Sequence, residues 1–169
     1  MNILYANEEC LELEKYYSVM LLGPTPRNKE TKSWRPNFIE QLKLHDDPYD
    51  KTLDNVMILS PECRNDIWLD NYDSQITWEQ KHLDLANLLV FWVPRELTHM
   101  PAFTTNIEFG MYIMSDKDFI YGRPDNSPKN KYLDFSYEKY RNKKPYGDTS
   151  TMIYDIVNNY IKPYNESRY

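Results

Sequence analysis

Short, wholly apolar segments separated by helical patterns constrain this chain more than any other feature. The most apolar of them, residues 88–93, reads LLVFWV and stops at Pro94. Continuous rather than alternating apolar strands indicate a sheet that is buried on both faces. Strands that alternate with helices favour parallel pairing through right-handed crossovers. The sequence therefore predicts an α/β domain with a doubly wound parallel sheet flanked by helices.

The same pattern places the individual elements. Strands are expected at residues 16–22, 55–59, 88–93 and 119–121. Helices are expected at residues 34–44, 74–86, 105–115 and 153–161, the last ending before Pro163 and leaving a mobile tail. Residues 1–15 and 123–150 have weak periodicity. We therefore expect an N-terminal extension at 1–15, one domain at 16–169, and within it a long loop at 123–150 with at most one edge strand.

Composition excludes several classes of partner. The 169 residues carry a net charge of −6, which argues against a nucleic acid polymer as the ligand. No apolar stretch is long enough to cross a membrane, and the first residues lack a signal-peptide pattern. Cys10 and Cys63 form no metal-binding spacing, and two thiols fit a reducing compartment. We expect a cytoplasmic protein.

The loops that follow the strands are the expected ligand site, because open parallel sheets bind ligands beyond the carboxyl ends of their strands. Residues 23–27 read GPTPR. Their two prolines lack the backbone donors that a phosphate cradle needs, so a Walker A or dinucleotide loop is a poor interpretation. The loop instead offers a rigid turn, the Thr25 hydroxyl and the Arg27 guanidinium. It is equally compatible with a stiff turn that binds nothing.

Glu108 admits two interpretations. With Thr105 it forms a capping-box pattern, in which a glutamate bonds back to the start of its helix. Alternatively, a carboxylate in the first helical turn, stabilised as the anion by the helix dipole, can attack an anomeric carbon. Glu79 is either a favourable charge near a helix start or a group that binds the sugar or shuttles a proton. Asn106 is either an ordinary first-turn residue or a partner for the sugar.

A metal site has little support. His45, Asp46, Asp47 and Asp50 are close in the sequence, but their spacing matches neither a helical pair of ligands nor a calcium loop. A polar loop is the simpler interpretation, and we expect no metal.

Five pieces of the sequence, in this order, resemble the nucleoside 2-deoxyribosyltransferase-like family. They are residues 22–27 (LGPTPR), 33–36 (SWRP), 78–79 (WE), 86–95 (ANLLVFWVPR) and 100–110 (MPAFTTNIEFG). The resemblance spans residues 16–124 and implies a flavodoxin-like fold. It implies that Glu108 is the nucleophile and that Glu79 helps to hold the nucleoside. The implied reaction is a retaining exchange through a covalent 2-deoxyribosyl-enzyme, and water can replace the acceptor base.

The resemblance also implies the remaining site and the partners. Catalysis is assigned to Glu108 and Glu79, and substrate binding to Gly23, Pro24, Thr25, Arg27, Trp34, Arg35, Trp78 and Asn106. The expected ligands are a nucleoside or nucleotide and, in a transfer reaction, a free acceptor base. No cofactor is implied. Family members form homodimers or larger homo-oligomers, and in many of them a C-terminal tyrosine, here Tyr169, reaches a neighbouring site.

The chain departs from the better-known transferases at two positions. Ala102 replaces an aspartate that is thought to help protonate the departing base, and Asn87 replaces an aspartate before the third strand. The first departure leaves three functions open. They are a transferase or glycosidase as above, a nucleotide hydrolase in which Arg27 or Arg35 holds a phosphate, and a non-catalytic protein that binds or sequesters a nucleotide.

Overall fold

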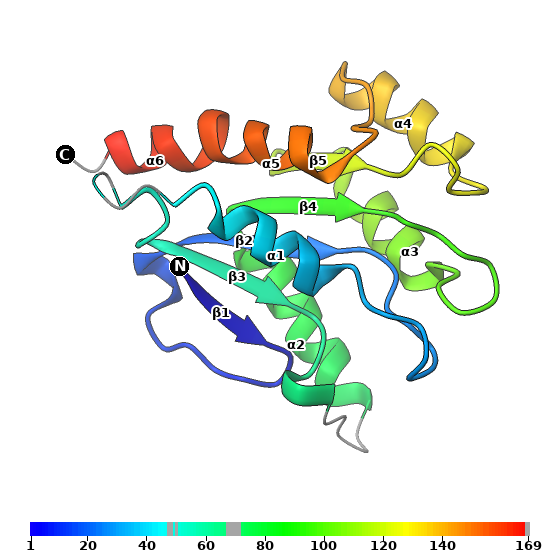
Figure 1. The fold of residues 1–169 in the computed structure, drawn as a ribbon, viewed down its shortest axis with the longest axis horizontal. Coiled ribbons are helices and arrows are strands. Elements are labelled where there is room, and N and C mark those ends of the chain that lie inside the picture. The colour runs from blue at the N-terminus through cyan, green and yellow to red at the C-terminus, as the bar shows by residue number, and fades with distance from the viewer. Residues whose placement is uncertain (47–48, 50, 67–71, 168–169) are drawn as a thin grey trace.

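The computed structural model describes residues 1–46, 49, 51–66 and 72–167. Within these residues, five parallel strands form one sheet in the order β1-β3-β2-β4-β5 (Figure 1). The strands are β1 Asn2–Tyr5, β2 Tyr17–Leu22, β3 Val56–Ser60, β4 Leu88–Trp92 and β5 Asp118–Gly122. The predicted doubly wound, flavodoxin-like sheet is confirmed, and β2 to β5 match the four predicted strands.

The burial of the three central strands accounts for the continuous apolar segments in the sequence. Every residue of β2, β3 and β4 is buried, as continuous apolar strands covered on both faces require. The polar residue in β2, Ser18, is satisfied locally. Its backbone N–H and its hydroxyl both donate to Asn87 Oδ1 at 2.8 Å. Asn87 therefore joins the amino ends of β2 and β4, at the opposite edge of the sheet from the expected ligand site.

The N-terminal segment differs from the prediction. Residues 2–5 form the edge strand β1, which pairs with β3 in the register Ile3↔Ile58. The strand has only four residues, and its pattern of exposure is mixed because one side of an edge strand has no neighbour. Such a short strand has too little periodicity to be recognised in the sequence. Part of the predicted extension thus belongs to the sheet.

Helices cover both faces of the sheet. One face carries α1 Arg35–Lys43, α5 Thr149–Ile156, the π-helical turn Val157–Ile161 and α6 Lys162–Glu166; the other carries α2 Tyr72–Leu85, α3 Phe103–Tyr112 and α4 Lys131–Arg141. Figure 1 shows α1 in front of the strands and α2 behind them. Two short 3-10 turns, Leu13–Lys15 and Arg64–Asp66, lie in the connections. Two apolar clusters, one on each face, form the core.

Helix α4 lies where a long loop was expected, so that prediction for residues 123–150 was wrong. Its buried residues Leu133 and Tyr137 are four apart and pack on the cluster of α2 and α3, as an amphipathic helix does. Tyr132 and Phe135, however, are exposed at 81% and 65%. Apolar residues on both sides of the helix obscure its periodicity in the sequence.

The C-terminal helix runs through Pro163 instead of ending before it. Residues 157–161 form a π-helical turn, whose wider winding gives room for the proline ring against the preceding turn. Pro163 then lies in the first turn of α6, where its missing N–H is not needed. The Tyr164 ring lies 4.9 Å from that of Tyr17, and Asn165 donates to Thr52 O at 2.8 Å. Residues 163–167 are thus packed on the domain, while Tyr169 lies outside the described residues.

The strand order decides where a ligand can bind. From β2 the chain passes through α1 to β3 on one side, and then through α2 to β4 on the other side of β2. The connections diverge between β2 and β4, and this is where open α/β sheets bind ligands. Among the described helices, none is both long enough and apolar enough to span a membrane.

Candidate functional site

An open cavity of about 410 Å³ lies beyond the carboxyl ends of β2, β3 and β4. Its volume is within the range of small-molecule sites. The loop after β2, the start of the loop after β3 and the amino-terminal parts of α2 and α3 form its walls. The described lining residues are Leu22, Gly23, Pro24, Thr25, Pro26, Arg27, Arg35, Pro61, Tyr72, Gln75, Glu79, Pro101, Ala102, Phe103, Thr104, Thr105 and Glu108. Seven of the ten predicted site residues are among them.

Gly23 allows the loop after β2 to lie directly against β4. A Cβ atom there would lie 2.1 Å from Trp92 O and 2.9 Å from the Trp34 ring, and the φ of +154° is unfavourable for any side chain. Trp34 Nε1 donates to Pro24 O at 3.2 Å. Trp34 therefore supports the loop from behind and does not line the cavity, although substrate binding was predicted for it.

Arg35 is the structural centre of this wall. Its side chain is 1% exposed, and its Nε donates to Leu21 O at 3.1 Å. Its two Nη atoms donate to Gly23 O at 2.8 Å, Thr25 Oγ1 at 3.1 Å and Glu62 Oε1 at 2.8 Å. Four contacts occupy most of its five N–H donors. Arg35 lines the cavity, but most of its N–H donors already bind the loop and Glu62, so few remain to bind a phosphate.

Glu108 lines the cavity from α3, but it lies further from the start of the helix than predicted. The helix begins at Phe103, and its N-cap is Ala102 in the left-handed region with φ of 60°. Thr105 is therefore already inside the first turn and Glu108 lies in the second, so the capping-box interpretation was wrong. The dipole argument also weakens, because that effect fades beyond the first turn.

The electrostatic state of Glu108 differs from the predicted, dipole-stabilised anion. Burial removes water from its carboxyl and raises its pKa to about 7, and the charge of Glu79 adds to this rise. The opposing effect of the Arg35 charge is smaller. Burial likewise raises the pKa of Glu79, against a hydrogen bond from Gln75 and the charge of Arg35. The cavity thus contains two carboxyls that interact and resist ionising together.

Gln75 fixes the second carboxyl. Its amide nitrogen donates to Glu79 Oε1 at 2.8 Å and to Pro61 O at 3.1 Å, which joins α2 to the loop after β3. Gln75 lies one helical turn before Glu79 and lines the same cavity. The pattern QxxxE in a helix is too common for the sequence alone to identify this residue.

The mouth of the cavity is aromatic and cationic. Phe103 is 65% exposed, Tyr72 is 58% exposed, and both line the cavity. The Arg27 guanidinium lies over the Phe103 ring, 5.1 Å from its centroid. Neither aromatic residue is among the predicted site residues. With 25 aromatic residues in the chain, only their exposure beside a cavity distinguishes them.

Two predicted binding residues lie elsewhere. Trp78 is buried in the core, where its Nε1 donates to Glu8 O at 2.8 Å and its ring lies 4.0 Å from the ring of His82. Asn106 lies on the outer side of α3 and accepts a hydrogen bond from Arg95 Nη2 at 2.5 Å. Trp78 precedes Glu79 by one residue and Asn106 precedes Glu108 by two. Residues one or two apart in a helix point to different sides of it, so neither side chain faces the cavity.

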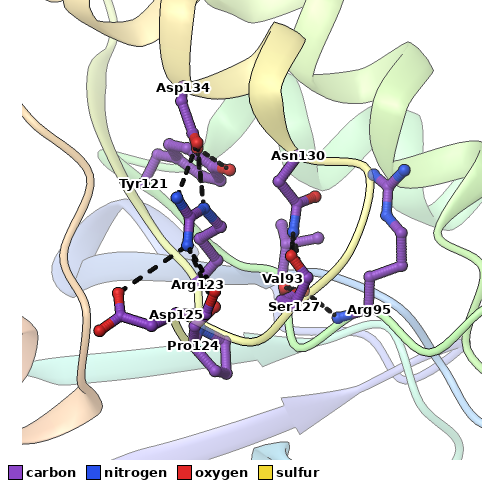
Figure 2. Close-up of polar contacts among 9 residues, drawn as sticks. All are labelled: Val93, Arg95, Tyr121, Arg123, Pro124, Asp125, Ser127, Asn130 and Asp134. Atoms are coloured by element: carbon purple, nitrogen blue, oxygen red, sulfur yellow. Dashed lines mark hydrogen bonds and ion pairs between the residues drawn. The ribbon is translucent and has the colours of Figure 1, made fainter.

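Arg95 belongs to a polar network that braces the loops after β4 and β5 (Figure 2). Ser127 Oγ donates to Val93 O at 2.8 Å and accepts hydrogen bonds from Arg95 N–H at 2.8 Å and Asn130 Nδ2 at 2.7 Å. The Arg95 side chain then reaches Asn106 in α3. The network therefore connects the ends of two strands to the helix that carries Glu108.

A second group of contacts in Figure 2 holds α4 against the sheet. Asp134 accepts hydrogen bonds from the Arg123 guanidinium, the shortest at 2.8 Å, and from the Tyr121 hydroxyl at 2.8 Å. Arg123 follows β5 directly, so this ion pair joins α4 to the sheet. Its role is structural support behind the cavity.

The metal interpretation gains nothing from the structure. In the part of the chain that the structure describes, no three His, Cys, Asp or Glu side chains are grouped in a way that would hold an ion. Asp47 and Asp50 of the sequence cluster lie outside the described residues.

The chain matches a known protein family. The sequence model of a family described as nucleoside 2-deoxyribosyltransferase like matches residues 16–126, well over half of the chain. The matched range contains β2 to β5, α1 to α3 and every lining residue named above. A search among curated proteins found no match.

Proposed function

Because the chain belongs to the nucleoside 2-deoxyribosyltransferase-like family, we propose that it cleaves or transfers the N-glycosidic bond of a deoxynucleoside or deoxynucleotide through a glycosyl-Glu108 intermediate. Membership of the family supports glycosyl transfer in general. One observation carries the finer proposal. The Glu108 carboxyl lines an open cavity at the divergence of β2 and β4, together with a second, interacting carboxyl, Glu79.

In the first step, an ionised Glu108 oxygen attacks the anomeric carbon of the sugar and forms a C–O bond. The C–N bond breaks, and its electron pair leaves with the base. The carboxylate also stabilises the oxocarbenium-like transition state before the bond is complete. The poorly solvated position of Glu108 favours a neutral acylal-type ester over a buried charge, which is consistent with its raised pKa.

Glu79 supplies the proton that the departing base needs. Ala102 stands at the position of the family's aspartate and contributes only a methyl group to the cavity wall. Among the described lining residues, Glu79 and Glu108 are the carboxyls. Burial raises the pKa of both carboxyls, and their mutual repulsion favours a pair that retains one proton. In the reactive form that we propose, this proton is on Glu79, where the hydrogen bond from Gln75 leaves the other oxygen for the substrate. In such pairs, one carboxyl can act as the nucleophile while its neighbour acts as the acid.

The second step reverses the first with a different nucleophile. A nitrogen of a free base, or water, attacks the anomeric carbon, the Glu108 ester bond breaks, and Glu79 takes the proton of the attacking group. The result is transfer in the first case and hydrolysis in the second. Atoms and protons balance without a cofactor.

The test is chromatography of bases released from a panel of nucleosides and nucleotides, with and without a free acceptor base. The Glu108→Gln variant keeps the size of the side chain but removes the nucleophile, and we expect base release to fall at least about 1,000-fold, as for other nucleophile losses. Intact-mass measurement of the rapidly denatured parent enzyme should detect a covalent sugar adduct that the variant lacks.

Glu40→Gln is the matched control, because Glu40 is exposed on α1 and pairs only with Lys43 in the described structure. Full activity of Glu108→Gln on every cleaved substrate contradicts the assignment of the nucleophile. Tight nucleotide binding by the parent protein with no product after long incubation would instead identify a sequestering protein, the alternative that Ala102 suggests.

We also propose that the chain forms a homo-oligomer. Phe103, Ile107 and Met111 on α3 and Met114 in the turn after it lie at intervals of three and four, and each is more than half exposed. A continuous apolar stripe of this kind is uncommon on a monomer surface. A second copy that covers this stripe would also lie next to the mouth of the cavity.

A further inference from the structure

We propose that the substrate carries a 5′-phosphate and that Arg27 binds this phosphate at the mouth of the cavity. The preferred substrate class is then the nucleoside 5′-monophosphate and not the free nucleoside. The inference names the substrate of the site proposed above and rests on that function. Four features of the cavity support it.

The first feature is an available guanidinium. Arg27 lines the cavity and is exposed, and among the described residues no carboxylate forms an ion pair with it. The guanidinium lies over the face of the Phe103 ring, and this contact leaves its N–H edge open. A planar guanidinium with a free edge matches the oxygens of a phosphate in a bidentate arrangement.

The second feature is the fixed position of Arg27. Its backbone N–H donates to His99 O at 2.9 Å, and His99 Nδ1 lies 2.8 Å from the amide nitrogen of Asn28. Glu96 accepts the backbone N–H of His99 at 2.6 Å. The loop after β2 is thus bound to the loop after β4. Arg27 enters the cavity mouth from a supported backbone, which reduces the entropy lost when a ligand binds.

The third feature is the distance from the proposed reaction centre. Arg27 lies over Phe103, and Phe103 precedes Glu108 by five residues in α3. Five residues correspond to about 7.5 Å along a helix axis. This rise is comparable with the span from the anomeric carbon of a nucleotide to its 5′-phosphate. A nucleotide that lies along α3, with its sugar against Glu108, is therefore long enough to bring its phosphate to the end of the cavity where Arg27 lies.

The fourth feature is the distribution of charge. Arg35 is neutralised by Glu62 at 2.8 Å, so it attracts an anion poorly. Glu79 and Glu108 repel a phosphate from the inner part of the cavity. Thr25 Oγ1 accepts a hydrogen bond from Arg35, which leaves its hydroxyl hydrogen free to donate toward an anion. The position that remains favourable for an anion is the cavity mouth, where the Arg27 guanidinium can bind one phosphate.

The experiment compares each deoxynucleoside with its own 5′-monophosphate in the parent protein and in Arg27→Gln. For the parent, we expect kcat/KM for base release to be higher with the monophosphate. Arg27→Gln should lower kcat/KM for the monophosphate about 10- to 100-fold, the range expected for lost charge-assisted hydrogen bonds, and change the nucleoside value less than about twofold. Lys29→Gln is the matched control, since Lys29 is an exposed cation two residues further along the same loop.

Binding to the Glu108→Gln variant separates this inference from the proposed function. Titration calorimetry with the monophosphate and the nucleoside, with and without Arg27→Gln, measures recognition without turnover. If the parent releases no base yet Arg27 confers a preference for the monophosphate, the phosphate site stands and the catalytic proposal fails. Equal binding of both ligands, equal losses on both in Arg27→Gln, or binding of neither overturns the phosphate site.

Discussion

Glu108 and Glu79 are one electrostatic unit, and their mutual effect gives a prediction at the scale of single residues. The pKa of Glu108 is raised to about 7, first by burial and then by the Glu79 charge. Because the reactive pair carries one proton and one charge, kcat/KM should decline as the pH rises above about 7 and the second carboxyl ionises. In Glu79→Gln only one carboxyl is left in the pair, so this alkaline decline should be absent.

The measurement is the pH profile of kcat/KM, normalised to its maximum so that the slower chemistry of the variant does not obscure the shape. Glu40→Gln should keep the parental profile. An alkaline decline that persists in Glu79→Gln would mean that another group controls it.

At the same scale, the sequence identified Glu108 and Glu79 by resemblance but misjudged their environment. A carboxyl near the start of a helix looked like a stabilised anion. Its pKa depends instead on how much water the loops after β2 and β4 exclude, and on a second acid 29 residues earlier in the chain. Neither quantity is local in sequence.

Among the elements, the connection after β2 depends on one glycine. An Ala Cβ at position 23 would lie 2.1 Å from the backbone oxygen of Trp92, and neither strand can move freely to relieve this contact. Gly23→Ala should therefore lower the free energy of unfolding by about 1–3 kcal/mol, the range for overpacking, and impair base release as the loop is displaced. Chemical denaturation measures the first effect.

Gly110→Ala is the opposite case in the same fold. Gly110 lies within α3, and a Cβ there has no atom within 4 Å. Alanine favours a helix over glycine, so this variant should gain about 0.5–1 kcal/mol of stability. If both variants lose similar stability, the close approach of Gly23 to Trp92 is not what distinguishes them.

For the whole molecule, the exposed stripe on α3 predicts the state of association. Met111→Glu places a charge in its centre, which a partner copy would have to bury, and should shift an oligomer toward monomers. Analytical ultracentrifugation over a range of concentrations measures the change. Glu138→Gln, on α4 and outside the stripe, serves as the control variant. A parent protein that stays monomeric at high concentration rules out self-association through this face.

The alternation of apolar strands and helices was enough to determine the fold class, because burial on both faces leaves a pattern along every central strand. Four strands and the main helices were recognisable for this reason. Strand β1 and helix α4 were not, since a four-residue edge strand and a helix with aromatic residues on two sides lack a clean period.

The chemistry divides in the same way. Residue types and order along the chain were sufficient to propose a glutamate nucleophile, a second acid and a loop with a cation. Only the tertiary structure distinguished the two arginines: Arg27 is open at the cavity mouth, whereas Arg35 donates hydrogen bonds to backbone oxygens and Glu62. It also showed that Trp34, Trp78 and Asn106 do not line the cavity. The direction and solvation of a side chain arise from contacts between segments distant in sequence, and no local pattern encodes them.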